Sequence, residues 1–506
     1  MKKTSFISNI NYQILMVFMQ RISGLIVSIL LVKFLAPQGV GIFSLFQRLC
    51  EQTTQVLRVG LSTSTQVLVA SSEAPKQETT PKGSLIGVAL LINFITVIFG
   101  ALFLIVFRDF VSEELFQQSS MKPWMYCLTI FCVFQALENI FEGVLKGLSR
   151  FKVFGLVNTY LALGYCILVP IFTSFFSLKG AIYMVTFIQT LKTLIYLIFT
   201  IQAVGVEKIR INIDNFYKSS LEHLKIAAPF YAPTLVSAPV MVFLYKLLTE
   251  HGGLESMAYL RIMVSIGTIV LVIPTAINSV FLSRFAGENE LDKTQNALEE
   301  LFLLNFKVIC LLSILVSLAT LSILPVLVAY LFSSNLGSYE TVISSAPYFF
   351  PTLTVVNLYN LTTSALLARK NAKTVMISNL MVSLSWCIAG MILIPSLAFS
   401  GYLITELLGF FCGLLISIFL FSRVIEVSTE LYKVFFKILI LGLVVFSLVF
   451  YLNEILQTFY RIIIFGGTGL FCLILFWKYF FVKSEKDRFL SIGSDIIIKF
   501  KTIFNF

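Results

Sequence analysis

Long apolar runs alternate with short polar connections along the whole chain. Each run has about 20 residues or more, the length that an α-helix needs to cross roughly 30 Å of hydrocarbon. The runs do not alternate apolar and polar residues, as the strands of an outer-membrane barrel do. The pattern predicts an all-α polytopic membrane protein with about 14 transmembrane helices. These helices are expected at residues 10–34, 40–70, 84–107, 123–148, 152–176, 180–203, 225–249, 255–283, 299–331, 341–368, 372–395, 401–422, 433–452 and 460–482.

A weak internal repeat divides the predicted helices into two groups of six. The stretch ENIFEGVLKGLSRFKVFGLVNTYLALGYCILVP and the stretch NLYNLTTSALLARKNAKTVMISNLMVSLSWCIAGMILIP each hold a span, a tight basic turn and a span ending in Val-Pro or Ile-Pro. Repeats of this kind favour two pseudo-symmetric lobes. We therefore expect an N-terminal lobe at 1–203, a linker at 204–224, a C-terminal lobe at 225–425, and two further helices with a basic tail at 426–506.

The linker has the pattern of an amphipathic surface helix. Its apolar positions are Ile213, Phe216, Tyr217, Leu221 and Leu224. An amphipathic helix at this place would lie on the membrane surface and connect the two lobes. The C-terminal stretch FLSIGSDIIIKFKTIFNF is a candidate for a second such helix.

Composition supports a membrane protein and argues against nucleic-acid binding. Hydrophobic residues make up 58% of the chain and charged residues 12%, about half the charged fraction of a soluble domain. The formal net charge is +11, but Lys and Arg gather in alternate loops, which is an orientation signal. We expect a multi-pass protein of the bacterial cell (inner) membrane, with a retained first helix and both termini in the cytoplasm. The eight cysteines are scattered and indicate neither disulfides nor a metal site.

The predicted span at 40–70 carries a polar stripe at membrane depth. On one helix with 100° per residue, one face holds Arg48, Glu51, Gln55, Arg58, Ser62 and Gln66, with Gln52 at its margin. An arginine at mid-bilayer costs roughly 2.5–3.5 kcal/mol on insertion scales, so it is retained only where it is paired or functional. One alternative is that Glu51 neutralises Arg48 within a structural network. We favour a cavity lining, because one carboxylate cannot neutralise two arginines.

A second polar stripe lies in the fourth span. It consists of Gln135, Glu138, Asn139, Glu142 and Lys146. Its carboxylates either pair with the arginines Arg48 and Arg58 across the lobe, or one of them exchanges Na⁺ or H⁺ during transport. Glu142 is expected to pair with Lys146 at i+4, whereas Glu138 is the better candidate for ion coupling.

Other charges complete the embedded set. Arg21 and Lys192 fall near the middle of their spans, while Arg261 and Lys307 fall near span ends, where snorkelling is the simplest explanation. Only Glu406 adds to the carboxylates of the two stripes. The surplus is therefore positive, and guanidinium groups bind phosphate oxygens in a bidentate manner. The predicted binding set is Arg21, Arg48, Arg58, Lys192, Arg261, Gln52 and Gln55, with Glu51, Glu138 and Glu142 as coupling or structural carboxylates.

No pattern for catalysis or cofactor binding is found in the sequence. It contains no Walker-type phosphate loop, and His223 and His251 have no metal-ligand spacing. A Ser/His/Asp arrangement is not visible in any loop. These observations predict a carrier without metal or cofactor, and not an enzyme, with Na⁺ or H⁺ coupling left open.

Three segments resemble a known transporter family. ISGLIVSILLVKFLAPQGVGIFSLFQRLCEQTTQVLRVGLSTS is similar to the opening of polysaccharide and oligosaccharide flippases of the multidrug/oligosaccharidyl-lipid/polysaccharide (MOP) exporter superfamily. LKGLSRFKVFG and GGLESMAYLRIMVSIGTIVLVIPTAINSVFLSRFA resemble later parts of the same family. The family's first-loop turn matches Leu35, Ala36, Pro37 and Gly41.

The resemblance implies two lobes in a V around a central cavity that opens alternately to each side. It implies flipping of an undecaprenyl-pyrophosphate-linked oligosaccharide to the outer leaflet for cell-surface polysaccharide synthesis, such as capsule or O-antigen export. The partners would be this glycan, membrane lipids and glycan polymerase or assembly proteins. The alternatives are a lipid II flippase, a multidrug cation antiporter, which should have an acidic cavity, and a membrane scaffold.

Overall fold

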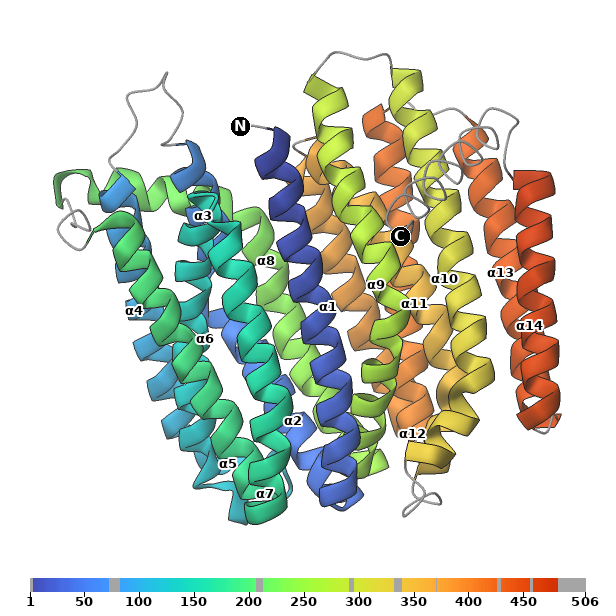
Figure 1. Ribbon diagram of the computed structural model, residues 1–506, viewed down its shortest axis with the longest axis horizontal. Helices are drawn as coiled ribbons and strands as arrows, with labels where there is room; N and C mark the ends of the chain where they lie inside the picture. The colour runs from blue at the N-terminus through green and yellow to red at the C-terminus, as the bar shows by residue number, and fades with distance from the viewer. Residues whose placement is uncertain are drawn as a thin grey trace, which may run out of the picture. The chain divides into compact units, whose positions relative to one another are not determined.

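The computed structural model describes residues 3–71, 82–205, 213–290, 295–331, 339–369, 371–425, 429–455 and 458–480, and every long element in these ranges is a helix (Figure 1). Eight of the described helices are long and apolar enough to cross a membrane. Two of them, α7 and α12, have 54 residues each and a non-helical residue inside, so each holds two spans. The chain is therefore a multi-pass, all-α membrane protein, as the hydrophobic pattern predicts.

The helices follow the predicted spans in order. The first half comprises α1 (Lys3–Phe34), α2 (Pro37–Leu57), α3 (Leu61–Ser71), α4 (Lys82–Val106), α5 (Arg108–Glu114), a 3₁₀ turn (Ser119–Met121), α6 (Trp124–Gly147) and α7 (Phe151–Val204). The second half comprises α8 (Ile213–Gly252), α9 (Glu255–Glu290), α10 (Gln295–Leu331), α11 (Glu340–Ala368), α12 (Ala372–Ile425), α13 (Thr429–Ile455), α14 (Thr458–Leu475) and a π-helical turn, η4 (Phe476–Phe480).

Backbone contacts divide the chain into two compact units. The first comprises Met1–Ile269, Leu331–Val342 and Ala372–Cys412. The second comprises Val270–Tyr330, Ile343–Asn371 and Gly413–Phe506. The first unit contains all the predicted site residues.

The prediction of one helix over 40–70 is wrong, because the chain breaks between α2 and α3. Val59 and Gly60 have positive φ angles of 49° and 67°, which end the helix. Neighbouring helices bind the carbonyls that the break leaves open. Thr96 Oγ1 donates to the Leu57 carbonyl at 2.9 Å, and Tyr231 Oη donates to the Val56 carbonyl at 3.0 Å. The polar stripe of Arg48 to Gln66 is thus divided between two helices.

The two longest helices bend at equivalent residues. Ser177 in α7 has φ 53° and ψ −140°, and Ala398 in α12 has φ 48° and ψ −119°. Three residues after each bend a glycine, Gly180 or Gly401, lies so close to a backbone carbonyl five residues before the bend that a Cβ would overlap it. The repeated joint gives geometric support for the weak sequence repeat.

Small residues let α6 pack closely against α3. A Cβ on Gly143 would lie 2.5 Å from the Ser62 carbonyl oxygen, and one on Gly147 would lie 2.9 Å from that of Gln66. Glycines four residues apart commonly allow such close approach of membrane helices. This contact brings the polar faces of α3 and α6 together.

Residues 204–205 of the predicted linker are the last residue and the C-cap of α7, and the linker from Ile213 onward is the beginning of α8, in the same helix as the following span. Tyr217, Leu221 and Leu224 are exposed, as a helix at a membrane surface requires. Ser219 and His223 are buried on the other side. Residues 206–212 and the tail from residue 481 onward lie outside the described residues.

In the second unit, aromatic and polar contacts join α10, α11 and α12. Phe302 and Phe421 have ring centroids 4.3 Å apart, and Asn357 Nδ2 donates to Ser313 Oγ at 3.0 Å. Lys307 is 5% exposed. The prediction that Lys307 snorkels is therefore wrong, because its side chain is covered by neighbouring helices.

Candidate functional site

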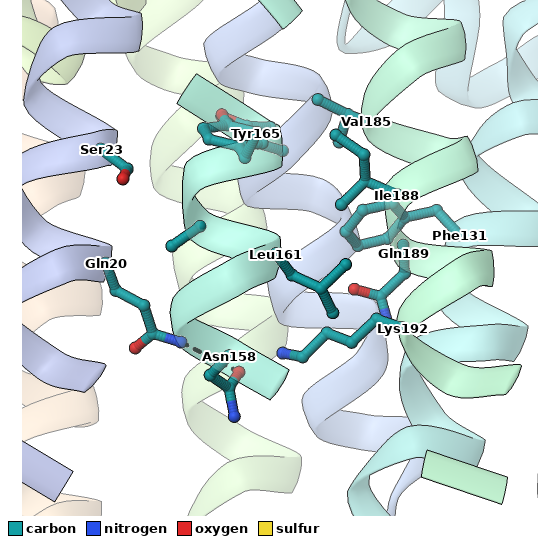
Figure 2. A pocket seen from close by; sticks show the side chains of 12 residues that line it. Gln20, Ser23, Phe131, Asn158, Leu161, Tyr165, Val185, Ile188, Gln189 and Lys192 are labelled. Atoms are coloured by element: carbon teal, nitrogen blue, oxygen red, sulfur yellow. Dashed lines mark hydrogen bonds between the residues drawn. The ribbon is translucent and has the colours of Figure 1, made fainter. Parts of the chain in front are cut away.

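A polar pocket of about 200 Å³ lies inside the first unit, between α1, α2, α6 and α7 (Figure 2). Its lining combines amides, one ammonium group and apolar side chains. The residues are Gln20, Ser23, Gln47, Phe131, Asn158, Leu161, Ala162, Tyr165, Val185, Ile188, Gln189 and Lys192. We call it the amide pocket. The pocket is smaller than the roughly 300–1,000 Å³ of drug-sized ligand sites, so it accepts waters or one small group.

Lys192 in the wall of the amide pocket is neutralised by Glu138. Lys192 Nζ lies 2.8 Å from Glu138 Oε1, and Gln189 Nε2 donates to Glu138 Oε2 at 2.7 Å. The Glu138 side chain is only 5% exposed. Both carboxylate oxygens therefore have protein donors. The alternative in which Glu138 pairs with Arg48 or Arg58 does not hold, because α7 places Lys192 beside it instead.

A hydrogen-bonded chain continues from the amide pocket into the interior. Gln20 Nε2 donates to Asn158 Oδ1 at 3.1 Å (Figure 2). The Asn158 amide donates to Tyr196 Oη, and the Tyr196 ring is stacked on Phe154 with centroids 6.0 Å apart. These contacts fix the amide groups that line the pocket.

Arg48 is bound by neutral groups, not by a carboxylate. Its Nη1 donates to Tyr245 Oη at 3.3 Å, and its guanidinium lies 5.7 Å from the centre of the same ring. Tyr245 is adjacent to Tyr402, which donates to Glu406 Oε1 at 2.9 Å. Glu51 is exposed, and among the described residues it forms no ion pair with Arg48. No direct ion pair supports the alternative in which Glu51 neutralises Arg48, although Glu51 and Glu406 lie close enough to Arg48 to interact with it electrostatically.

Arg261 is held against α2. It donates to Gln47 Oε1, and its guanidinium lies 4.9 Å from the centre of the Phe43 ring. Gln47 in turn donates to Tyr165 Oη at 3.2 Å, and both line the amide pocket. The snorkelling explanation for Arg261 is wrong, because its side chain points to the polar interior of the unit.

A second cavity, of about 240 Å³, lies beside the break between α2 and α3. We call it the break cavity. Its lining is mostly polar and comprises Gln55, Arg58, Gly60, Ser62, Thr63, Gln66, Asn139, Glu142, Lys146, Tyr231 and Thr234. Lys146 forms an ion pair with Glu142, which confirms the predicted i,i+4 pair. Arg48 and Arg58 thus occupy different environments instead of one continuous stripe.

The remaining predicted site residues are Arg21 and Gln52. Arg21 is exposed on α1, whereas Gln52 is 9% exposed. Neither lines the two cavities. Within the described parts of the chain, no group of three His, Cys, Asp or Glu residues lies close enough to hold a metal ion.

Charge pairing separates the lysines of the site from its arginines. Lys146 and Lys192 each form an ion pair. Among the ion pairs between described residues, none includes an arginine of the predicted set, namely Arg21, Arg48, Arg58 or Arg261. The ammonium groups thus have direct carboxylate partners. Arg48 and Arg58 form no direct ion pair in the described part of the chain and interact with carboxylates only at longer range, Arg48 with Glu51 and Glu406 and Arg58 with Glu142.

Several residues of the site have no signal in the sequence. Tyr245, Tyr402, Gln47 and Asn158 are neutral residues on different helices, and their importance appears only when packing brings them beside the charges. Charge at membrane depth is the signal that sequence reasoning can use. An aromatic or amide partner is uncharged and therefore gives no comparable signal in the sequence.

Solved structures with the same arrangement of helices are transporters. A structure described as lipid II flippase MurJ in an inward closed conformation aligns with a TM-score of 0.69 and 15% identity, over 93% of this chain and 98% of that chain. The chain has the fold of MOP-superfamily transporters. An inward-facing multidrug resistance MATE family transporter aligns with a TM-score of 0.63 and 15% identity, over 81% of this chain and 96% of that one.

A third similar structure is a MOP superfamily transporter from Pyrococcus furiosus, whose description reports reverse polarity of its binding pocket. It has a TM-score of 0.62 and 15% identity, and covers 83% of this chain and 95% of that chain. No protein-family model matches the sequence, and no curated protein matches it. At these identities the likeness establishes the fold alone.

Proposed function

We propose that the protein is a flippase that moves an undecaprenyl-pyrophosphate-linked oligosaccharide from the cytoplasmic to the outer leaflet by alternating access. The observation that carries this proposal is the set of arginines without direct carboxylate partners in the first unit. Guanidinium groups retained in a membrane protein at a cost need a function. A pyrophosphate supplies the oxygens that they can bind in pairs.

The amide pocket supports a sugar-bearing passenger. Gln20, Gln47, Asn158 and Gln189 present amide groups around it. Amides both donate and accept hydrogen bonds, which suits the hydroxyl groups of a sugar. Its volume of about 200 Å³ fits one group of the passenger at a time, and the polyprenyl chain would stay in the lipid.

A multidrug cation antiporter is the less favoured alternative, although MATE transporters share the fold. An organic cation needs an unpaired carboxylate, and the two most deeply placed carboxylates of the polar stripes are engaged by Lys192 and Lys146. A lipid II flippase is the stronger alternative, because the alignment with MurJ extends over 98% of that chain.

Transport in proteoliposomes tests the proposal. Vesicles would carry a fluorescent polyprenyl-pyrophosphate oligosaccharide, lipid II, or the cation ethidium. We expect flipping of the oligosaccharide lipid to be lost in the double variant Arg48→Gln/Arg261→Gln. The matched control is Arg108→Gln, a half-exposed arginine beside Asp109 at the start of α5, which should flip normally. Transport of lipid II alone would favour the second candidate, and ethidium transport alone would contradict the proposal.

A further inference from the structure

The break cavity has a wall of polar side chains without protein partners. The side chains of Arg58, Gln55, Gln66 and Thr63 line it and form no hydrogen bond or ion pair with another described residue. Thr63 is exposed and Gln55, Arg58 and Gln66 are half-buried, so water or a ligand in the cavity can reach their polar groups. The cavity can therefore bind a polar molecule.

The charge of the break cavity is positive. Its cations are Arg58 and Lys146, and its one carboxylate is Glu142. Glu142 is engaged by Lys146, whose ammonium also lies 4.5 Å from the centre of the Phe154 ring. Two cations and one carboxylate give the cavity a net charge of +1, which is located on the guanidinium group of Arg58. This geometry favours an anion whose oxygens can accept two parallel N–H bonds.

The walls of the cavity are fixed before any ligand binds. Tyr231 on α8 donates to the Val56 carbonyl at the end of α2. Gly143 lets α6 approach the backbone of Ser62 on α3. Arg58 itself caps α2, since its N–H donates to the Thr54 carbonyl at 3.0 Å. A preformed site loses less conformational entropy on binding than a mobile one.

The size of the cavity sets the size of the ligand. Its volume of about 240 Å³ is below the range of roughly 300–1,000 Å³ for drug-sized ligands. It holds one sugar ring with one phosphate, and not an oligosaccharide. The amides of Gln55 and Gln66 can both donate to and accept from ring hydroxyls.

We propose that the break cavity binds a single phosphorylated sugar unit, with the phosphate on Arg58 and the hydroxyls on Gln55 and Gln66. The inference rests on the proposed function in that the same chemistry occurs in the head group of the passenger. The site is separate from Arg48 and Arg261, and it would hold the sugar nearest to the phosphate. A soluble sugar phosphate carries the same groups and is the other source of this ligand.

Binding to the purified, full-length protein tests the inference. Two probes separate the sources: glucose 1-phosphate in solution, and nanodiscs containing a polyprenyl-pyrophosphate-linked monosaccharide. Glucose serves as the uncharged control ligand. We expect saturable binding of at least one phosphorylated probe and weaker binding of glucose. A lost charge-assisted bond of about 1.5–3 kcal/mol corresponds to a roughly ten- to hundredfold weaker affinity in Arg58→Gln.

Matched variants distinguish this site from the rest of the protein. Arg58→Lys keeps the positive charge but loses the two parallel N–H donors of the guanidinium group. It should weaken binding less than Arg58→Gln. Arg108→Gln, which lies in neither cavity, should bind both phosphorylated probes as the wild type does. An unchanged melting temperature without ligand shows that each variant is folded. Wild-type binding that Arg58→Gln leaves unchanged, or no binding of either phosphorylated probe, would overturn the inference. Normal flipping by Arg48→Gln/Arg261→Gln would instead overturn only the proposed function.

Discussion

Lys192 on α7 forms an ion pair with Glu138 on α6, with 2.8 Å between Nζ and Oε1, in the polar interior of the first unit. Gln189 donates to the other carboxylate oxygen. Because protein groups engage both oxygens, the structure favours a structural role for Glu138 over ion coupling. The pair also removes Lys192 from the cations that are available to the anionic passenger that we propose.

The ion pair gives the first prediction. Glu138→Gln leaves a covered ammonium without its counter-charge, and loss of one partner of a buried pair costs about 3–5 kcal/mol. We expect the lower end of this range, since the Lys192 side chain is 21% exposed. Removing both charges in Glu138→Gln/Lys192→Met should restore much of the loss. Thermal unfolding in detergent measures both.

The same variants test ion coupling. Flipping by the double variant Glu138→Gln/Lys192→Met should keep the Na⁺ and pH dependence of the wild type. A loss of either dependence, with normal folding, would return Glu138 to the coupling role that its sequence position suggests.

The repeated bends in α7 and α12 give a second prediction. Gly180→Ala and Gly401→Ala each place a methyl group against a backbone carbonyl that cannot move without shifting the helix. Overpacking of this kind costs about 1–3 kcal/mol, so both variants should unfold at a lower temperature. Gly164→Ala in α7 is the matched control, because nothing lies within 4 Å of a Cβ there. Equal stability of all three variants would contradict the packing at the bends.

His223 gives a prediction about pH. It is fully buried at the beginning of α8, where Nε2 donates to the Leu85 carbonyl at 3.0 Å and Nδ1 lies 3.1 Å from Ser64 Oγ. Burial lowers the pKa of the His223 imidazole, while the bond to the Leu85 carbonyl opposes this shift. The unfolded chain then binds the proton more readily than the folded one.

The sign of the effect follows from this difference. The contribution of His223 is complete above about pH 6.5, the usual pKa of histidine, and it falls as the pH drops towards the lowered pKa of the folded state. Wild type should therefore lose stability between pH 7.5 and 5, and His223→Gln should lose less over the same interval. His251→Gln is the control, because His251 is exposed. Parallel pH profiles for all three proteins would contradict the buried neutral imidazole.

The sequence predicts those features that depend on neighbouring residues. Apolar runs of the right length locate the helices, because crossing hydrocarbon depends mainly on the length and polarity of one segment. The pair of Glu142 and Lys146 is predictable for the same reason, since i and i+4 always meet on a helix. The break at Val59 and Gly60 is missed because the polar stripe continues through it.

Contacts between helices cannot be predicted from the pattern of residues along one segment. The partner of Glu138 depends on how α6 packs against α7, and the partner of Arg48 depends on α8. Charge balance along the sequence indicates that cations exceed carboxylates, but not which cations are neutralised. Only the packed structure separates the paired lysines from the arginines.

The most direct test of the account compares binding of polyprenyl pyrophosphate with binding of the uncharged polyprenol in nanodiscs. Wild-type protein and Arg108→Gln should prefer the pyrophosphate, and the preference should weaken at high salt because it is electrostatic. Arg48→Gln/Arg261→Gln should fold normally and lose most of the preference. An undiminished preference in this double variant would contradict the claim that the arginines without direct carboxylate partners receive the phosphorylated end of the passenger.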